Sequence, residues 1–386
     1  MSSLKILIAG DFCPIGRNED IIDRGDYKSL FNGFEEITKS MDYSIVNLEC
    51  PITKSKKKIK KTGPCIKSEN MKSLEALKFA NFNLLTLANN HIQDYSEEGV
   101  IDTIEHAKKY QFDIIGAGKN KKAAAQPLIK KINNVNIGFI NIAENEFCAA
   151  SDNCAGANTF DLIDNLKTIK ELRPKVDKII LIYHGGREHY QLPTPNQRKR
   201  LRFFIENGVD AIVAHHTHCF SGYEFYNQKP IIYSLGNFIF DYKKKYQKGK
   251  WTEGMSAILK LRNINDNFEI DLITHRQGTI YDSSLRILKS EEEKKITDKV
   301  EELSKLITND KEYFIAWYTY LRSQEKFYLS SLYIKNIFLR ALFIKGILPI
   351  KLLINNHNKL LLNLNRCETH REILNNILSN NERKNI

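Results

Sequence analysis

Short apolar runs bounded by polar or turn-forming residues alternate with helix-like segments through the first two thirds of the chain. Runs of this kind are typical of strands that are buried on both faces. Helices are indicated over residues 68–80, where Ser68 is a candidate N-cap, and from Ser96, where the first turn is acidic. The pattern predicts an α/β fold. The first three strand-like runs are residues 4–9, 43–49 and 83–88.

The later part of the chain changes from α/β alternation to hairpins and then to helices. Residues 128–143 have the pattern of a hairpin around Asn133-Asn134, and strand-like runs at 178–183 and 211–213 continue the alternation. Beyond them, apolar runs joined by short polar turns predict antiparallel strands. Together these elements predict two packed sheets flanked by helices, followed by a helical region to the end of the chain.

Composition sets limits on the class of protein. The chain has 386 residues, of which 42% are hydrophobic, so it can bury a core, and this excludes a disordered or collagen-like chain. The formal net charge of +12 predicts attraction to something anionic, such as nucleic acid, a membrane surface or an acidic substrate. The first apolar run ends at Gly10-Asp11 with no cleavage site, which indicates a strand and not a signal peptide.

Two further features favour a cytoplasmic setting. The chain contains no uncharged apolar stretch long enough to predict a transmembrane helix of the ordinary kind. Its seven cysteines are irregularly spaced and match neither a disulfide framework nor a zinc-ribbon pattern. A reduced, cytoplasmic environment is therefore expected.

Residues capable of metal and acid–base chemistry come directly after the predicted strands, where α/β folds place ligands. Each strand end offers its own donors: Asp11; Glu49; Asn90, His91 and Asp94; His184, Glu188 and His189; and His215, His216 and His218. Carboxylates, an amide and several imidazoles from separate strand ends are the donor set that a two-metal site requires.

In such a site a carboxylate bridges two divalent cations about 3.5–4 Å apart. His91 could then protonate a leaving group, with Asp94 orienting its ring. His216 and His218 are two apart, so on an extended segment both side chains would point the same way. Taken singly, Asp11 could instead cap a turn and Glu49 could be a surface residue, but the combination favours a metal site.

These residues lie in blocks that resemble a known family. GDFCP, NLECPIT, LANNHIQDY, HGGREHY and HHTH, followed by YEFYNQKPIIYSLGNFIFD, look like the signature blocks of CapA-type proteins of poly-γ-glutamate or capsule biosynthesis. That family belongs to the calcineurin-like metallophosphoesterase superfamily. The resemblance covers residues 4–285 and implies a four-layer α/β/β/α sandwich. Together with the predicted helical region, the resemblance divides the chain into a CapA-like domain over 1–288 and a helical C-terminal extension over 289–386.

The resemblance also implies roles for individual residues. It implies metals at the strand ends, which we expect to be one or two divalent ions (Mn, Zn or Fe), and His91 matches the general-acid histidine. The expected catalytic residues are His91, Asp94 and Glu188. The positions that match metal ligands are Asp11, Glu49, Asn90, His184, His216 and His218.

Two positions depart from the superfamily pattern. Cys13 stands where the superfamily usually has a histidine ligand, and Ala214 stands where the last histidine block usually has a glycine. The Cys13 thiol could ligate a metal or be a buried structural thiol. The number of metals therefore stays open between one and two.

Three clusters of lysine and arginine, at 54–61, 197–202 and 243–250, adjoin the motif blocks. They could be solvated loops, but their positions favour a positive rim for a polyanionic substrate. No nucleic-acid-binding motif accompanies them, so nucleic acid is not an expected partner. The candidate substrate-binding residues are Lys57, Lys58, Arg187, Arg198 and Lys244.

Residues 285–386, which include the helical tail, carry half of the net charge of +12. Within the tail, residues 326–366 contain seven basic side chains and no acidic one. Lys335, Arg340 and Lys345 are five residues apart, which would spread them around a single helix. The tail is expected either to pack on the core or a partner, or to contact a membrane peripherally through 326–366. Peripheral contact would place the protein at the inner face of the membrane.

Three hypotheses for function follow. The first is a metal-dependent hydrolase that cleaves a phosphoester or a γ-glutamyl amide in an anionic capsule or cell-envelope polymer, its precursor, or a small acidic substrate. The second is a non-catalytic scaffold of the same fold, with partners in a poly-γ-glutamate or capsule synthesis complex. The third is a simple polyanion-binding module that uses the basic rim.

Overall fold

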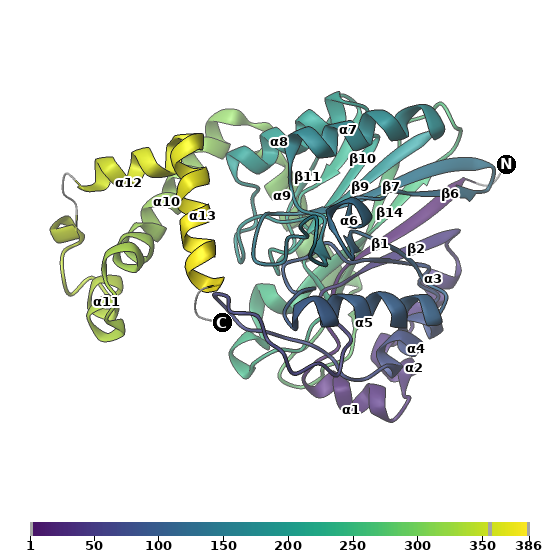
Figure 1. The fold of residues 1–386 in the computed structure, drawn as a ribbon. Helices are drawn as coiled ribbons and strands as arrows, with labels where there is room; N and C mark the ends of the chain where they lie inside the picture. Colours follow the sequence, from purple (N-terminus) through teal and green to yellow (C-terminus); the bar gives the residue numbers. More distant parts are fainter. Residues whose placement is uncertain (1–2, 354–356, 384–386) are drawn as a thin grey trace. The chain divides into compact units, whose positions relative to one another are not determined.

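The computed structural model describes residues 3–353 and 357–383. The chain divides into two compact units, Met1–Asp310 and Lys311–Ile386. The first unit contains two large β-sheets with helices on their outer faces, and the second is helical (Figure 1).

The first sheet has four parallel strands at one side and antiparallel strands at the other. Its order is β16-β15-β14-β1-β2-β3-β4, and β13 pairs with β1 in parallel. Burial on both faces explains why β1 and β2 read as continuous apolar runs. The strands are β1 (Leu4–Phe12), β2 (Tyr43–Leu48), β3 (Leu84–Thr86), β4 (Asp113–Ile115), β13 (Asn237–Ile239), β14 (Glu253–Leu261), β15 (Glu269–Arg276) and β16 (Arg286–Ile287).

The second sheet has the order β11-β12-β10-β9-β7-β6, with a parallel centre and an antiparallel strand at each edge. The hairpin predicted at 128–143 is present, and Asn133 and Asn134 make its turn with φ of 47° and 69°. The strands are β6 (Leu128–Ile132), β7 (Val135–Ala143), β9 (Lys178–His184), β10 (Ala211–His215), β11 (Tyr223–Tyr226) and β12 (Lys229–Ile232); a separate pair is β5 (Ala117–Gly118) and β8 (Gly156–Ala157).

Helices cover the outer faces of both sheets, which gives the four-layer α/β/β/α arrangement (Figure 1). The group α1–α5 packs on the first sheet, while α7 and α8 cover the second. The helices of the first unit are α1 (Arg17–Asp23), α2 (Tyr27–Phe31), α3 (Phe34–Lys39), α4 (Lys72–Phe79), α5 (Ser96–Lys109), α6 (Lys121–Ala124), α7 (Leu162–Leu172), α8 (Pro195–Glu206) and α9 (Ser290–Thr308), with 3₁₀ turns η1 (Arg173–Lys175), η2 (Lys244–Tyr246) and η3 (Gly249–Thr252).

Alternating residues of the first sheet bind it to its helices. Leu7 and Ala9 of β1 belong to one buried cluster with side chains of α1–α5, including Leu77 and Val100. The residues between them, such as Ile8, are equally buried on the other face. Each strand therefore contributes to two apolar layers, which fixes its register.

The helix predicted over 68–80 begins later than expected. The structure has α4 from Lys72, with Met71 at its N-cap. Ser68 instead makes a β-bridge with Ile52, and its hydroxyl accepts a hydrogen bond from the backbone N–H of Asn70. Serine stabilises such turns as readily as helix starts, which is why the pattern misplaced the boundary.

The first helix of the predicted tail belongs to the same compact unit as the sheets. Helix α9 contacts β11 and β15 and lies within the first compact unit, which ends at Asp310. The family-domain boundary at residue 288 stays a prediction. The second unit contains α10 (Asp310–Tyr333), α11 (Ile337–Ile344), η4 (Ile350–Leu353), α12 (His357–Arg366) and α13 (Glu368–Arg383). Among the described residues, no helix combines the length and the apolar character needed to cross a membrane.

One core histidine makes folding stability depend on pH. His275 is completely buried beside the rings of Phe34 and Phe238, and burial lowers its pKa to about 3. Because the unfolded chain takes up this proton near pH 6.5 and the folded chain does not, stability falls as the pH drops below 6.5.

Between pH 7 and pH 5 we expect the wild type to lose about 2 kcal/mol more unfolding free energy than His275→Gln. Urea unfolding in a Trp317→Phe background would isolate the first unit, because Trp251 is then the remaining tryptophan. The exposed His370→Gln is the control, and an unchanged pH dependence in His275→Gln would contradict the expectation.

Candidate metal centre

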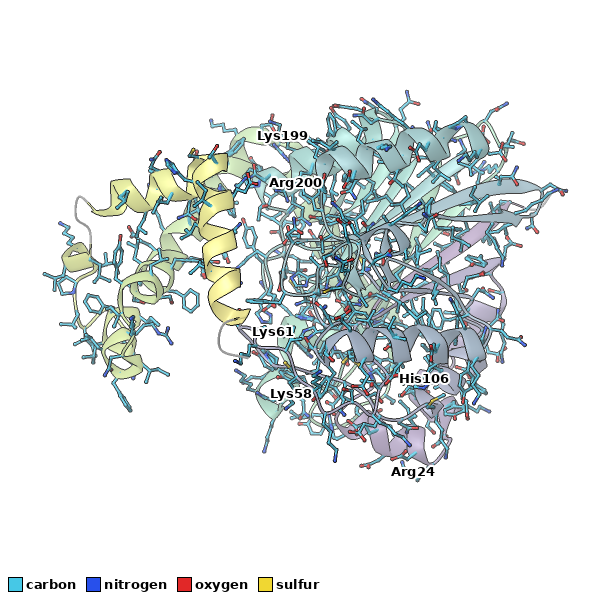
Figure 2. All side chains as sticks on the ribbon, in the orientation of Figure 1. Arg24, Lys58, Lys61, His106, Lys199 and Arg200 are labelled. Carbon is cyan, nitrogen blue, oxygen red and sulfur yellow. The ribbon has the colours of Figure 1, made fainter. Side chains whose placement is uncertain are left out.

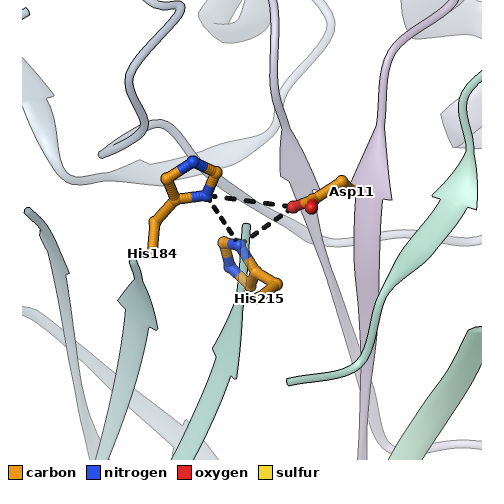
Figure 3. A group of neighbouring side chains, drawn as sticks. All are labelled: Asp11, His184 and His215. Atoms are coloured by element: carbon orange, nitrogen blue, oxygen red, sulfur yellow. Dashed lines mark hydrogen bonds and ion pairs between the residues drawn. The ribbon is translucent and has the colours of Figure 1, made fainter. Parts of the chain in front are cut away.

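The strand ends of both sheets converge on one buried group of side chains. Asp11 lies near the end of β1 and Glu49 directly follows β2, while His184 and His215 end β9 and β10. The parallel register of β9 and β10 places the Cα of His184 opposite that of His215. Figure 3 shows these two imidazoles facing the Asp11 carboxylate from the opposing sheet.

Three overlapping groups of donors meet the geometry expected around a metal ion. They are Asp11–His184–His215, Glu49–His184–His216 and Asp11–Glu49–His218, and all their members are buried. Asn90 joins the second group, because its Oδ1 lies 3.0 Å from His184 Nε2. Every residue predicted as a ligand is therefore in one cluster, and Asp11, Glu49 and His184 are each shared between two groups.

Direct contacts link the histidines to one another and to the carboxylates. His184 Nε2 lies 3.0 Å from His216 Nδ1 and 3.8 Å from Glu49 Oε1. His218 Nε2 lies 3.9 Å from the same Glu49 oxygen, and its Nδ1 lies 2.9 Å from Asn237 Oδ1. The amide of Asn237 thus orients His218 with its Nε2 toward Glu49, as outer hydrogen bonds commonly orient metal ligands.

Among the residues that the structure describes, neither oxygen of the Glu49 carboxylate has a hydrogen-bond partner, although the side chain is fully buried. Burial and the neighbouring charges of Asp11 and Glu188 raise the pKa of Glu49 well above its ordinary value. An unpaired buried carboxylate is costly and calls for a cation. Burial also lowers the pKa of His184 well below its ordinary value and that of His216 to about 4, which keeps both neutral and able to ligate. These residues fit a divalent metal.

His216 and His218 do not lie on the extended segment that the sequence predicted. Strand β10 ends at His215, and His216 and His218 have positive φ of 108° and 54°. The prediction that both point the same way along an extended segment was wrong about the backbone. A bend in the left-handed region turns them inward, and strain of this kind concentrates at functional sites.

His91 and Asp94 form a buried pair beside the centre. His91 Nδ1 lies 2.6 Å from Asp94 Oδ2, and the same oxygen accepts the backbone N–H of Ile66. Lys61 pairs with the other Asp94 oxygen, while its Nζ lies 3.2 Å from His91 Nδ1. The Lys61 side chain is only 4% exposed, so this is a buried triad whose members hold one another in place.

Aromatic rings wall the centre on the side of His218. The Trp251 ring is centred 4.4 Å from the His218 ring, and Phe240 meets His218 edge-on at 5.4 Å. Tyr246 stacks between Trp251 and His189, with ring centres 4.6 Å and 5.8 Å away. The basic segment 243–250 is therefore anchored by Tyr246 beside His218.

Cys13 is buried in the aromatic cluster that contains Cys50, Phe240 and Trp251. Burial and the adjacent Cys50 raise the pKa of Cys13 well above its ordinary value, which favours the protonated thiol. Cys13 is in none of the three donor groups found among the described residues. Its placement is that of a structural thiol.

The predicted rim residues differ in their exposure to solvent. Lys57, Lys58 and Lys244 are exposed, and Lys58 and Lys61 extend from one loop (Figure 2). Arg187 and Glu188 are half-buried on the turn that follows β9. Burial acts to raise the pKa of Glu188, but the charges of His218 and His216 outweigh it and hold the pKa below its ordinary value.

The basic cluster at 197–202 is largely used by the fold. Arg198 is buried and donates to the carbonyl of Ile307 and the carboxylate of Asp310, which fastens α8 to the end of α9. Arg202 pairs with Glu224, and Arg200 lies over the Phe160 ring (Figure 2 labels Arg200). Arg198 is therefore a structural residue here, a correction to its expected place on a substrate rim.

The structure places three further residues against the centre: His215, which was a candidate donor without an assigned role, and Asn47 and Lys61, which were not candidates. His215 Nδ1 lies 3.0 Å from Asp11 Oδ1 and 2.8 Å from His184 Nδ1. Asn47 donates to Asp11 Oδ1 at 2.8 Å, and Lys61 joins the His91–Asp94 pair. Asn47 could have been found, since it is two residues from Glu49 and on the same side of the strand. Lys61 could not be told apart from its neighbours in a run of lysines.

Comparison with known proteins gives a consistent family match. The model of the family described as "Bacterial capsule synthesis protein PGA_cap" matches residues 5–242. The "PGA biosynthesis protein CapA" of Bacillus subtilis (strain 168) is 34% identical over 284 residues, 72% of this chain and 73% of the relative. The "Capsule biosynthesis protein CapA" of Bacillus anthracis is 30% identical over 273 residues, 68% of this chain and 64% of the relative.

Solved structures are more distant. A 5'-nucleotidase precursor from Thermus thermophilus aligns with a TM-score of 0.45 and 11% identity, over 70% of this chain and 54% of that chain. A likeness at that level carries no weight for function.

Proposed function

This chain belongs to the bacterial capsule synthesis protein family PGA_cap, and from that membership together with its buried donor cluster we propose that it is a metal-dependent hydrolase. Its substrate would be an anionic capsule or cell-envelope polymer or a precursor of one. The observation that carries the proposal is the buried Glu49 carboxylate, unpartnered on both oxygens among three histidines and Asp11.

The residues that would hold one or two divalent ions are Asp11, Glu49, Asn90, His184, His216 and His218. A bound ion would supply a hydroxide nucleophile near neutral pH and stabilise charge on the substrate oxygen. The mixed oxygen and nitrogen donors suit Mn, Fe or Zn.

The His91 pair supplies the proton for the leaving group. Asp94 engages Nδ1 of His91, which leaves Nε2 as the donor toward substrate. Lys61 neutralises Asp94 and fixes its second oxygen, so the ring of His91 has one preferred orientation. The bond cleaved would be a phosphoester or a γ-glutamyl amide.

The exposed lysines would attract the polyanion. Lys57 and Lys58 belong to the loop that delivers Lys61, and Lys244 belongs to the segment anchored beside His218. Arg187 lies on the turn next to Glu188. Positive charge beside a site raises the local concentration of an anionic substrate and is sensitive to salt.

The test is hydrolysis by chelator-stripped full-length protein before and after addition of Mn²⁺. Bis-p-nitrophenyl phosphate probes phosphoester cleavage, and poly-γ-glutamate probes amide cleavage by release of new amino termini. Mn²⁺-dependent turnover of either substrate, abolished by Asp11→Asn, supports the proposal. Metal binding without turnover of these or related envelope phosphoesters would reject it.

The second candidate is a non-catalytic scaffold in a capsule synthesis complex. The burial of Cys13 at a position where the superfamily usually supplies a histidine favours it, because one ligand fewer weakens one of two metal sites. A scaffold predicts that polymer production survives His91→Ala in cells. Loss of polymer with normal protein levels would reject the scaffold.

His215 belongs to one of the three donor groups but is not among the expected ligands, and we propose that it tunes the metal through its contacts with two of them. Its Nδ1 contacts both Asp11 and His184, so His215→Ala removes a partner from two ligands at once. We expect the dissociation constant for Mn²⁺ to rise about 10–100-fold, as is typical when an outer hydrogen bond is lost. His215→Asn, whose amide can replace Nδ1, should recover most of the affinity in titration calorimetry; equal affinity in all three proteins would contradict this role.

A further inference from the structure

Helix α11 (Ile337–Ile344) exposes almost all of its large apolar side chains. Phe338 is 81% exposed and Ile337 is 63% exposed, and Leu339, Leu342 and Ile344 are each at least 37% exposed. Single exposed apolar residues are ordinary, but five on one helix of eight residues are a concentration typical of an interaction surface.

The elements on either side of α11 extend this surface. Leu332 near the end of α10 is 64% exposed, and Leu352 in η4 is 66% exposed. A side chain built on Gly346 would meet Lys326 Nζ at 2.7 Å, so α10 and the turn after α11 lie next to each other. Of the described residues 326–353, the buried ones are Ser330, Ile334 and Phe343.

Cations are interspersed with these apolar residues. Lys335, Lys345 and Lys351 are exposed, and Arg340 is half-buried in α11 itself. From residue 326 to residue 366 the sequence has seven basic residues and no acidic one. The surface therefore combines apolar area with an unbalanced positive charge.

The cation spacing that argued against an amphipathic membrane helix assumed one continuous helix, and the structure does not have one. A single long helix would distribute these cations around all its sides, but residues 333–353 do not form one helix. Helix α11 ends at Ile344, Gly346 turns the chain with φ of 77°, and η4 follows from Ile350. The angular spacing of a single helix does not apply across these breaks.

We propose that residues 326–353 are a docking surface for an anionic phospholipid bilayer. Phe338 and its neighbours would enter the boundary between head groups and acyl chains, and the lysines would reach the anionic head groups along their aliphatic stems. Helix α11 has eight residues, about 12 Å, so it enters one leaflet. Protein interfaces are depleted of lysine at their centres, which favours lipid over a protein partner.

The experiment is flotation of the full chain with vesicles of phosphatidylcholine alone, or with 30% phosphatidylglycerol, at low and high salt. We expect binding to the anionic vesicles only, weakened by salt. The variant Lys335→Gln/Arg340→Gln/Lys345→Gln should lower the partition coefficient roughly 100-fold, since each cation contributes about a factor of five. Phe338→Ser/Ile337→Ser should also abolish flotation.

The matched control is Ile163→Ser on α7 of the first unit, because Ile163 is 80% exposed and lies outside the surface. It should float like the wild type. Hydrogen exchange of the unaltered chain gives a check that needs no variant: anionic vesicles should slow exchange of amides 337–344. The proposal is overturned if the wild type does not float, if soluble poly-γ-glutamate protects 337–344 equally well, or if Phe338→Ser/Ile337→Ser instead dissociates a dimer in sedimentation. None of these outcomes depends on hydrolase activity.

Discussion

Glu49→Gln is expected to abolish tight metal binding and at the same time to stabilise the metal-free protein. The wild-type carboxylate is buried without a hydrogen-bond partner among the described residues, and its pKa lies well above the ordinary value. Glutamine keeps the shape and removes the charge. The dissociation constant for Mn²⁺ should rise by at least about 100-fold, more than the loss of an outer hydrogen bond produces.

The stability change has a sign that depends on pH. A raised pKa in the folded state means that the cost of Glu49 is absent below pH 4.5 and grows as the pH rises. Without metal, Glu49→Gln should therefore match the wild type at pH 4 and exceed it by about 1–3 kcal/mol at pH 8. With saturating Mn²⁺ the order should reverse.

Urea unfolding followed by Trp251 fluorescence in the Trp317→Phe background, with and without Mn²⁺, would measure both effects. Glu36→Gln is the matched control, because the Glu36 side chain is 72% exposed and its loss should change neither quantity. A Glu49→Gln protein that keeps its Mn²⁺ affinity would show that the cluster is not a metal centre.

His91→Ala should reduce kcat by about 10²–10⁴-fold while leaving metal content unchanged. His91 is buried beside Asn90 and is held by Asp94, but it belongs to none of the three donor groups. The loss should be smaller for esters of p-nitrophenol than for esters of phenol, because the better leaving group departs without a proton. Turnover of both ester types and bound Mn²⁺ would be measured on the same preparation.

Asp94 is a poor position for the same test. Replacing it would leave Lys61 buried without its ion-pair partner, which costs about 3–5 kcal/mol and confounds catalysis with folding. Equal losses for both esters in His91→Ala would contradict a proton-donor role, and loss of the metal would make His91 a ligand.

Much of the metal centre could be predicted because several of its residues end or directly follow strands that show as apolar runs in the sequence. Asp11, Glu49 and His184 end or follow apolar runs, and parallel strands bring such ends to one edge. Their grouping therefore followed from the order of the elements.

Other features depended on contacts that no local pattern encodes. The left-handed backbone at His216 and His218 is imposed by the bend after β10, not by residue type. Lys61 is distinguished from the neighbouring lysines by long-range packing against Asp94. Arg198 was predicted on the rim, but its hydrogen-bond acceptors are Ile307 of α9 and Asp310, more than a hundred positions later in the chain.

The most direct measurement is anomalous diffraction at the manganese edge from crystals of the full chain grown with Mn²⁺. A metal-dependent hydrolase predicts one or two peaks within about 2.0–2.2 Å of the Glu49 carboxylate, with His184 and His216 or His218 completing the shell. Density without any peak at this carboxylate, in protein saturated with Mn²⁺, would contradict the metal centre and the hydrolase that depends on it.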